Sequence, residues 1–390
     1  MDETIVIVNA KRTPMGGFMG SLASVDAPSL GAYSIDACMQ DINKSIVDEV
    51  IMGCVLPAGL GQAPARQAML AAGLPVRTGA MTINKVCGSG MKAVMLAHDL
   101  IKAGSAEIVV AGGMENMSAS PYLLPKARAG HRMGHSMMFD HMMRDGLENA
   151  YDAKAMGCFA QETADSEGID RLSMDDFAIR SLSLAKSAIE NGQFDDEITP
   201  VTVSSRKGEY IVDTDEGPGY ANIDKIPSLR PAFTKSGTVT AANSSSISDG
   251  AAALLIMTKS KAEALKLTPL AKIVAHATHA MEPKDFTVAP VGAIEKVLAK
   301  ANWTSEEVDL YEINEAFAMV TMLAIKKLSL DIAKVNINGG ACALGHPIGA
   351  SGARIIVTLL HALKRQGAHR GVASLCIGGG EATAIALERD

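Results

Sequence analysis

The sequence predicts a layered α/β fold in which two related halves each carry a parallel sheet with helices on its faces. Two observations support this prediction. Short β-branched runs bounded by glycines, typical of buried strands, alternate with segments whose apolar residues recur at helical spacing. The same order of elements occurs twice, in residues 81–118 and in residues 334–388. Strand–helix–strand alternation favours parallel strands, because the intervening helix must cross one face of the sheet.

Each of the two stretches can be followed element by element. Residues 81–118 begin with a strand that leads to Cys87 on a glycine-rich turn, and a helix follows with apolar residues at helical spacing from Met91 to Leu100. The buried strand IVVAGG and another turn close this stretch. Residues 334–388 repeat the strand, turn, helix, buried strand and turn, and add a final strand. We therefore expect glycine-rich turns from both halves to meet at one site.

The segment between the halves differs in character and predicts an inserted loop domain. It is rich in His and Met in GHRMGHSMMFDHMM, which could ligate a metal ion. Scattered His with Met on a helical pattern more often packs in a core or an interface, so we expect no metal site. A turn, a helix and a strand in TVTAANSSSISDGAAALLIMTKSKAEAL return the chain to the first half. The expected domains are 1–118 with 244–266, the loop domain 119–243, and 267–390.

Composition and charge exclude several classes of protein. The 390 residues are 48% hydrophobic and 20% charged, which is ordinary for two or three globular units. A net charge of −7 argues against nucleic-acid binding, and no apolar run is long enough to cross a bilayer. The N-terminus shows no targeting segment, so we expect a cytoplasmic protein. The cysteines are scattered without CxxC pairs and are expected to be reduced: Cys38, Cys54, Cys87, Cys158, Cys342 and Cys376.

Cys87 lies in NKVCGSGMKAV, at the start of the predicted helix and among glycines. The positive end of a helix dipole and free N–H groups favour a thiolate there, and the glycines let a substrate approach the backbone. A buried, inert thiol is the competing interpretation, since that is the commonest fate of a free cysteine. The motif alone does not choose between the two.

His346 and Cys376 occupy similar positions in the second half. His346 lies in the glycine-rich loop GGACALGHPIGASGAR, and Cys376 follows a buried strand in SLCIGGGEA. Each alone could be structural. Because parallel-sheet enzymes gather active groups at the carboxyl ends of strands, we expect both residues to converge with Cys87 in one pocket. A Cys–His pair is an activated-thiol arrangement, and a second thiol could move weakly acidic carbon protons.

Asn314 follows the predicted strand VDLYEI and begins the segment NEAF. Its amide could hold a water or donate to an oxyanion. It could instead cap the next helix, which is a common role for asparagine at a strand-to-helix junction. The residues around Asn314 do not distinguish the oxyanion role from the capping role.

Seven segments, in order along the chain, carry a resemblance to a known family. They are VNAKRTPMGGFMGSLA, VCGSGMKAV, AGGMENMS, GTVTAANSSSISDGAAA, EINEAFA, NINGGACALGHPIGASGAR and LCIGGGEA. With these motifs the chain resembles the thiolase family along essentially its whole length. The resemblance implies the thiolase fold, in which two related βαβαβ halves form a layered α/β/α/β/α core with an inserted loop domain.

The resemblance also implies a role for each matching catalytic residue. Cys87 corresponds to the cysteine that takes up the acyl group, and His346 to the histidine that accepts the proton of that cysteine. Cys376 corresponds to the cysteine that exchanges a proton with the acetyl-CoA methyl carbon. Asn314 corresponds to the asparagine that holds a water in one oxyanion hole together with the histidine. The second oxyanion hole uses main-chain N–H groups at positions that correspond to Cys87 and Gly378.

In the family the pantetheine arm of coenzyme A binds along the loop domain. Ser245 corresponds to the serine that contacts the arm, although a turn or helix-capping hydroxyl is the plainer alternative. Lys225 corresponds to a residue that contacts the nucleotide end in some relatives, and it could equally be a solvated surface charge. The apolar lining positions, some of which could be plain core, are Leu147, Met156, Ala316, Phe317 and Phe286.

Three positions carry residues that differ from those of some relatives. Short-chain biosynthetic thiolases usually have a histidine before the methionine of the HMG segment, where this chain has Ala155. Mitochondrial acetoacetyl-CoA thiolases, which the chain resembles in EPKDFTVAPV, use a tyrosine at a potassium site where Leu182 aligns. Since leucine offers no oxygen ligand, we expect no specific potassium site. Phe286 stands where other relatives have methionine, which would allow a 2-methyl-branched acyl group.

The resemblance implies an acetyl-CoA C-acetyltransferase, which joins two acetyl-CoA into acetoacetyl-CoA and CoA through an acyl-cysteine and catalyses the reverse thiolysis. Coenzyme A thioesters would be substrates, with no metal or redox cofactor. Two alternatives stay open: a degradative 3-ketoacyl-CoA thiolase of broader chain length, and an idle thiolase-like scaffold, which the reactive residues together disfavour. Residues Met133–Met143 correspond to the assembly loop of tetrameric relatives, so we expect a homotetramer built as a dimer of dimers.

Overall fold

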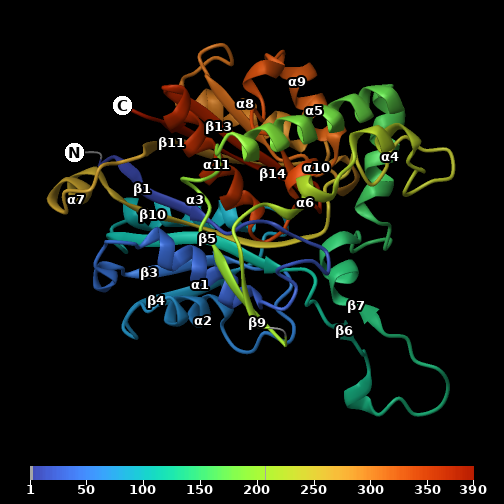
Figure 1. Cartoon of the computed structure of the whole chain (residues 1–390), viewed down its shortest axis with the longest axis horizontal. Helices are drawn as coiled ribbons and strands as arrows, with labels where there is room; N and C mark the ends of the chain where they lie inside the picture. Colours follow the sequence, from blue (N-terminus) through green and yellow to red (C-terminus); the bar gives the residue numbers. More distant parts are fainter. Residues whose placement is uncertain (1–2, 207) are drawn as a thin grey trace.

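One large mixed sheet forms the frame of the computed structural model, which describes residues 3–206 and 208–390 (Figure 1). The N-terminal half of the chain contributes β4, β3, β5, β10 and β1, with the short β2 beside β10, and the C-terminal half contributes the rest. The strands are β12 (Leu310–Ile313), β13 (Arg370–Ile377), β14 (Glu381–Glu388), β11 (Ala271–Ala280), β1 (Ile5–Arg12), β10 (Ser248–Thr258), β5 (Ile108–Asn116), β3 (Glu49–Gly53), β4 (Gly79–Ile83) and β2 (Gly16–Gly17).

The two halves of the sheet meet at a narrow join between β1 and β11, where Val6 pairs with Lys272 and Ile7 with Ala271. Within each half the pairing is mixed. β3 runs parallel to β4 and β5, and β12 runs parallel to β13, whereas the other main ladders are antiparallel. The prediction of parallel sheets is therefore only partly correct. The glycine turn 378–380 links β13 to β14 directly, and so short a connection joins antiparallel strands.

Two helices lie between the halves of the sheet and give the fold its layers. α3 (Ser89–Lys102) and α11 (Ser351–Gln366) share one apolar core with strands of both halves. They approach closely at glycines, because a Cβ on Gly352 would lie 2.4 Å from the Met91 nitrogen. Helices α1 (Ala27–Cys38) and α2 (Pro64–Ala71) cover the outer face of one half, and α8 (Ala289–Ala301) and α9 (Ala318–Leu328) cover the other. The predicted α/β/α/β/α layering is confirmed.

Residues 334–338, predicted as a strand, form an isolated bridge between Val335 and Tyr311 in place of a ladder. Asn336 adopts a positive φ of 47°, which takes the backbone out of the strand conformation. Its side chain then bonds to the edge of β12: Oδ1 accepts from the Ile313 N–H, and Nδ2 donates to the Ile313 carbonyl, both at 2.8 Å. The side chain thus supplies hydrogen bonds that a neighbouring strand would otherwise make.

The segment 119–243 packs beside both halves, and its first part, the β6–β7 hairpin, projects away from the body (Figure 1). Met133, which lies between β6 and β7 in the sequence, is fully exposed. The elements of the segment are β6 (Tyr122–Leu123), η2 (Ala127–Ala129), β7 (Phe139–Asp140), the π-helix η3 (Met142–Leu147), α4 (Met156–Glu167), α5 (Arg171–Glu190), β8 (Val201–Ser205), β9 (Gly208–Val212), α6 (Glu216–Tyr220) and η4 (Ile223–Ser228).

The return from this segment contains the predicted turn, helix and strand, with the strand first. The turn leads straight into β10, and helix α7 (Lys259–Ala264) follows it. The remaining short elements are η1 (Lys44–Ile46), η5 (Pro283–Asp285), η6 (Ile332–Lys334) and α10 (Ala341–Leu344). Among the described residues, no helix combines the length and apolar character needed to span a bilayer.

Candidate active site

A cavity of about 420 Å³ is lined by residues of both halves and of the inserted segment. Most of its lining is apolar, and the polar side chains along it are thiols, serine hydroxyls and one imidazole. Cys87, His346 and Cys376 all line it, as the sequence predicts. They come from the turn before α3, the loop before α11 and the end of β13. The central helix layer and the sheet therefore bring together residues that lie far apart in the sequence.

The turn that carries Cys87 is held in a constrained conformation. Val86 has a positive φ of 48°, which is unusual for a β-branched residue. The Ser89 hydroxyl accepts from the Lys85 N–H at 2.8 Å and donates to the Val86 carbonyl at 2.7 Å. α3 begins at Ser89, one residue beyond Gly88, so Cys87 lies just before the helix. A Cβ on Gly88 would lie 2.4 Å from Ile377 Cδ1, so glycine lets this turn press against the end of β13.

The thiol of Cys87 is protonated at neutral pH in the resting site. Burial raises its pKa to about 11, while the N–H groups of Gly378 and of Cys87 itself lower it and the charge of Glu115 raises it further. The N–H groups at the helix start favour the thiolate, as expected, but desolvation outweighs them and leaves the pKa of Cys87 raised. A nucleophilic role for this thiol would require a base to take its proton.

The side chain of His346 is neutral, and its Nε2 is free of hydrogen bonds to the described residues. Its Nδ1 lies 2.5 Å from the Ser351 hydroxyl, which donates its own proton to the Pro347 carbonyl at 3.0 Å. The hydroxyl oxygen therefore accepts from Nδ1–H, which leaves Nε2 without a proton. Nε2 is buried and has no hydrogen-bond partner among the described residues. Burial and the charge of Arg354 lower the pKa of His346 to about 3, so the ring is neutral and can accept a proton.

Asn314 lies behind His346 rather than on the cavity wall. Its backbone N–H donates to the Ser374 carbonyl at 3.0 Å, and its Nδ2 lies 3.5 Å from His346 Nδ1. Oδ1 is buried without a hydrogen-bond partner among the described residues. The next helix, α9, begins at Ala318 with Phe317 as its N-cap residue, so the capping alternative for Asn314 is wrong. The unpartnered amide oxygen is available to a bound water.

Cys376 is 1% exposed at the end of β13. Burial raises its pKa well above the ordinary value, and the negative charge of a Cys87 thiolate raises it further. Gly378 lies two residues on and also lines the cavity, and a Cβ there would stand 3.3 Å from Met156 Sδ. The backbone N–H groups of Gly378 and Cys87 both lower the pKa of the Cys87 thiol, so both face its sulfur.

Six of the seven positions implied for coenzyme A binding line the cavity. Phe317 gives it an aromatic wall, with ring centroids 6.4 Å from Phe286 and 6.2 Å from Phe233. Ala155, where short-chain relatives have a histidine, also lines it and directly precedes α4. The six implied positions that line the cavity are Ser245, Leu147, Met156, Ala316, Phe317 and Phe286.

Ser245 and Lys225 differ in how they relate to the cavity. Ser245 lies in the loop before β10 and donates its backbone N–H to the Ala316 carbonyl at 2.9 Å. No helix of the described residues starts at that point, so its helix-capping alternative is wrong. Lys225 lies exposed on η4 and is not part of the cavity lining. This position agrees with its interpretation as a solvated surface charge.

Glu115 is a functional candidate that the sequence did not single out. This fully buried carboxylate on β5 accepts from the N–H groups of Val55 at 2.9 Å, Leu56 at 3.1 Å and Gly349 at 2.9 Å. It thereby fastens the loop after β3 to the loop that carries His346. Burial raises the pKa of Glu115 to about 7. A charged residue inside the otherwise buried apolar run IVVAGGMEN was the available signal.

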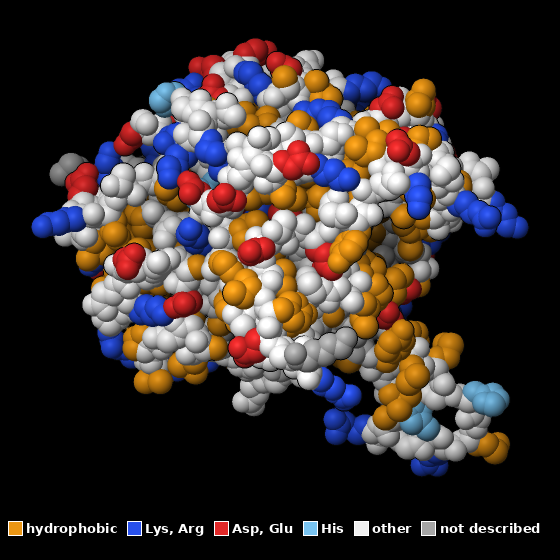
Figure 2. All heavy atoms as spheres, in the orientation of Figure 1, with side chains coloured by type: hydrophobic (Ala, Val, Ile, Leu, Met, Phe, Trp, Pro, Cys, Tyr) orange, Lys and Arg blue, Asp and Glu red, His pale blue; other side chains and the backbone are white. Residues whose placement is uncertain are grey.

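The His- and Met-rich piece of the inserted segment packs at its C-terminal end. Met133, Met137 and Met138 are exposed on the β6–β7 projection, where Figure 2 shows His and hydrophobic side chains at the surface. Nδ1 of His141 lies 2.6 Å from Asp145, four residues later, and its Nε2 accepts from the Ala58 N–H at 3.4 Å. Met142 is buried against Ile348 in a small apolar cluster. Within residues 3–206 and 208–390, His131, His135 and His141 do not share a cluster of metal-ligating groups. The packing interpretation fits these contacts.

Family models match the chain in two consecutive segments. Residues 5–260 match the thiolase N-terminal domain, and residues 267–389 match the thiolase C-terminal domain. The chain belongs to the thiolase family. Cys87 falls in the first matched segment, and Asn314, His346 and Cys376 fall in the second, so the cavity joins residues from both thiolase domains.

Individual relatives match this thiolase over nearly its full length. An acetyl-CoA acetyltransferase of Cupriavidus necator is 52% identical over 99% of both chains. One of Escherichia coli is 50% identical over 99% of both. Among solved structures, an acetyl-CoA acetyltransferase from Syntrophomonas wolfei superposes with a TM-score of 0.97 at 40% identity, with 100% of both chains covered. The corresponding Bacillus anthracis structure has a TM-score of 0.97 at 42% identity, covering 99% of this chain and 98% of that one.

Proposed function

We propose that this thiolase is an acyltransferase that condenses two acetyl-CoA into acetoacetyl-CoA and CoA, and that it runs the reverse thiolysis. One observation carries the proposal: two thiols and a neutral imidazole with a free Nε2 line a single apolar cavity. Relatives at about half identity over the full chain are acetyl-CoA acetyltransferases, which is the same reaction. The arrangement serves nucleophilic catalysis followed by proton removal from carbon.

In the first half-reaction Cys87 becomes acylated. His346 Nε2 takes the thiol proton of Cys87, and the sulfur attacks the thioester carbonyl of the first acetyl-CoA. The N–H groups of Cys87 and Gly378 stabilise the oxyanion that forms. CoA leaves as a thiolate and takes the proton of Cys376. The products are acetyl-Cys87 and CoA, with His346 protonated and Cys376 as a thiolate.

In the second half-reaction the Cys376 thiolate takes a methyl proton from the second acetyl-CoA. Because burial disfavours its charged form and raises its pKa, this thiolate is a strong base toward a weakly acidic carbon. Asn314, through a water, and His346 stabilise the enolate oxygen. The carbanion attacks acetyl-Cys87, and the Cys87 thiolate that leaves regains its proton from His346. All groups then return to their resting protonation states.

The range of acyl chains is a finer part of the proposal. The apolar lining and the small Ala155 leave room that an imidazole would fill, and a probable acetyl-CoA acyltransferase of Staphylococcus aureus is 47% identical. A 3-ketoacyl-CoA thiolase of broader range is therefore the second candidate. We propose the short-chain activity, with Phe286 at a position that would allow a 2-methyl branch.

Thiolysis rates measured on 3-ketoacyl-CoA substrates of increasing chain length separate these candidates. A steep fall beyond the four-carbon substrate supports the short-chain assignment, and equal rates on much longer chains contradict it. Ala155→His, measured beside wild type, should lower the rate on the longer substrates more than on the four-carbon one. Cys87→Ala should lack all activity, and Cys158→Ala, at a half-buried cysteine outside the cavity lining, is the matched control. Undiminished activity in Cys87→Ala contradicts the role of the nucleophile.

Other parts of the proposal concern the setting of the enzyme. We propose that coenzyme A thioesters are substrates and that the reaction itself uses no metal or redox cofactor, since thiols and an imidazole supply the chemistry. Lys225 would meet the nucleotide end of CoA only through a contact outside the cavity. The exposed methionines of the β6–β7 projection suit assembly into a homotetramer. A cytoplasmic location and reduced thiols accord with a catalytic cysteine pair.

A further inference from the structure

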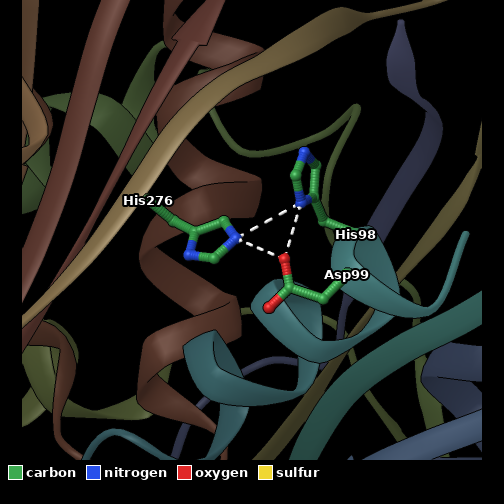
Figure 3. Close-up of side chains that lie close together, drawn as sticks. All are labelled: His98, Asp99 and His276. Carbon is green, nitrogen blue, oxygen red and sulfur yellow. Dashed lines mark hydrogen bonds and ion pairs between the residues drawn. The ribbon is translucent and has the colours of Figure 1, made fainter. Parts of the chain in front are cut away.

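Three side chains that ligate metals in proteins converge outside the cavity, where the two halves of the chain meet (Figure 3). His98 and Asp99 lie in the last turns of α3, and His276 lies on β11. Nδ1 of His98, Oδ1 of Asp99 and Nε2 of His276 point toward one another. In the part of the chain that the structure describes, no other group of at least three His, Cys, Asp or Glu side chains converges in this way.

The spacing of the three atoms suits a small cation. His98 Nδ1 lies 3.0 Å from Asp99 Oδ1, His276 Nε2 lies 2.9 Å from the same oxygen, and the two nitrogens are 3.2 Å apart. Ligands bonded to a tetrahedral Zn²⁺ at its usual bond lengths stand about 3.3 Å from one another. A shift of a few tenths of an ångström therefore opens the cluster enough for an ion.

The surroundings of the three side chains also bear on binding. The imidazoles are 15% exposed and the carboxylate is 52% exposed, so an ion has a path from solvent. Lys300 opposes a cation, since its Nζ donates to the His276 carbonyl at 2.9 Å.

We propose that His98, Asp99 and His276 bind one divalent transition-metal ion, with water completing the coordination. Two imidazoles and a carboxylate are a ligand set that suits Zn²⁺ and its neighbours in the first row. Because His98 and Asp99 belong to the N-terminal half and His276 to the C-terminal half, the bound ion ties α3 to β11. This site revises the expectation that the chain has no metal site. It is independent of the proposed reaction, since none of its residues lines the cavity.

Calorimetric titration of the full-length protein with Zn²⁺, after removal of metal with a chelator and dialysis, tests the site. Wild type should bind one ion per chain at this site, and His276→Ala and Asp99→Asn should each weaken that binding at least about tenfold. His135→Ala, which alters an exposed histidine on the β6–β7 projection, should bind as wild type does. Lys300→Gln should bind more tightly. Wild-type rates of thiolysis in each variant establish that it is folded.

Cobalt provides a second measurement that distinguishes histidine ligation from binding at the cysteines. Co²⁺ at this site should give visible ligand-field bands without thiolate-to-cobalt charge transfer. Asp99→Asn should change these bands, and it takes the place of His276→Ala in this test if that variant does not fold. Equal Zn²⁺ affinity and stoichiometry in His276→Ala, Asp99→Asn and wild type would overturn the proposal. So would a cobalt spectrum dominated by thiolate charge transfer, or a wild-type protein that takes up no Zn²⁺.

Discussion

Gly88 permits the contact between the Cys87 turn and the end of β13, and replacing it by alanine tests whether that contact sets the rate. The φ of Gly88 is −81°, which any residue adopts, so the substitution adds no backbone strain. The effect that we expect of Gly88→Ala comes from steric overlap alone. The new Cβ would lie 2.4 Å from Cδ1 and 3.0 Å from Cγ1 of Ile377, which is itself 2% exposed.

The expected magnitude follows from the size of this overlap. Apolar carbons normally approach to about 3.5–4.0 Å, so the turn or Ile377 must move by about 1 Å. Ile377 directly follows Cys376, so the shift changes the separation of the two thiols. A misplacement of about 1 Å at reacting groups costs about 100-fold in rate. Overpacking in a filled interior also destabilises the fold by about 1–3 kcal/mol.

Steady-state thiolysis of acetoacetyl-CoA measures the effect. Gly88→Ala should lower kcat by about 100-fold while the protein stays folded, because the site chemistry is intact but displaced. Ile377→Ala removes both clashing carbons, so the double variant Gly88→Ala/Ile377→Ala should recover most of the activity that Ile377→Ala retains alone. Full activity in Gly88→Ala, or equal losses with and without the Ile377 change, would refute the reasoning.

Three further predictions concern Glu115, Ser351 and Leu182. The folded-state pKa of Glu115 is raised from 4.5 to about 7. The stabilisation by its protonated form is therefore fully present below about pH 4.5, and about 3 kcal/mol of the free energy of unfolding is lost as pH rises through about 7. The free energy of unfolding in urea, measured at about pH 5 and about pH 8, should show that loss in wild type and not in Glu115→Gln. An equal change between the two pH values in both proteins contradicts the prediction. Ser351→Ala removes the acceptor that fixes the His346 tautomer, so kcat should fall by about tenfold or more with KM little changed; an unchanged kcat counts against the tautomer assignment. Leu182 is buried in an apolar cluster, so potassium should raise the rate no more than sodium at equal ionic strength; a selective rise with potassium shows that prediction wrong.

The main helices and strands were predicted because their signals are local, whereas the order of the layers was implied by the resemblance to the thiolase family. The apolar spacing of α3 and the β-branched run of β5 both depend on neighbouring residues alone. Residues 334–338 carry a strand pattern, but the hydrogen bonds of the Asn336 side chain to Ile313 replace the ladder. Those bonds join two parts of the chain, so the local pattern cannot report them.

The site shows the same division between local and distant effects. The convergence of Cys87, His346 and Cys376 was predicted, because strand ends and glycine turns mark their places. The protonation of Cys87 was not, because it depends on desolvation by a cavity that the whole fold builds. Glu115 was missed for a similar reason, since its partners Val55 and Gly349 come from separate loops.

The metal-ligating cluster lies furthest from what sequence patterns can reveal. His98 and His276 are separated by 178 residues, and neither lies in a run with metal-ligand spacing. Their meeting depends on how α3 of one half packs beside β11 of the other. The His- and Met-rich segment, by contrast, has a suggestive composition, but within the described residues its histidines share no such cluster.

Mass spectrometry of the acyl-enzyme tests the division of labour between the two cysteines most directly. Wild type and Cys376→Ala are mixed with acetyl-CoA, quenched in acid and digested, and the peptides that carry Cys87 and Cys376 are examined. The account predicts an acetyl group on the Cys87 peptide of both proteins, and no acetoacetyl-CoA from Cys376→Ala. An acetyl group on Cys376 in wild type, an unmodified Cys87 in both proteins, or condensation by the variant would contradict it.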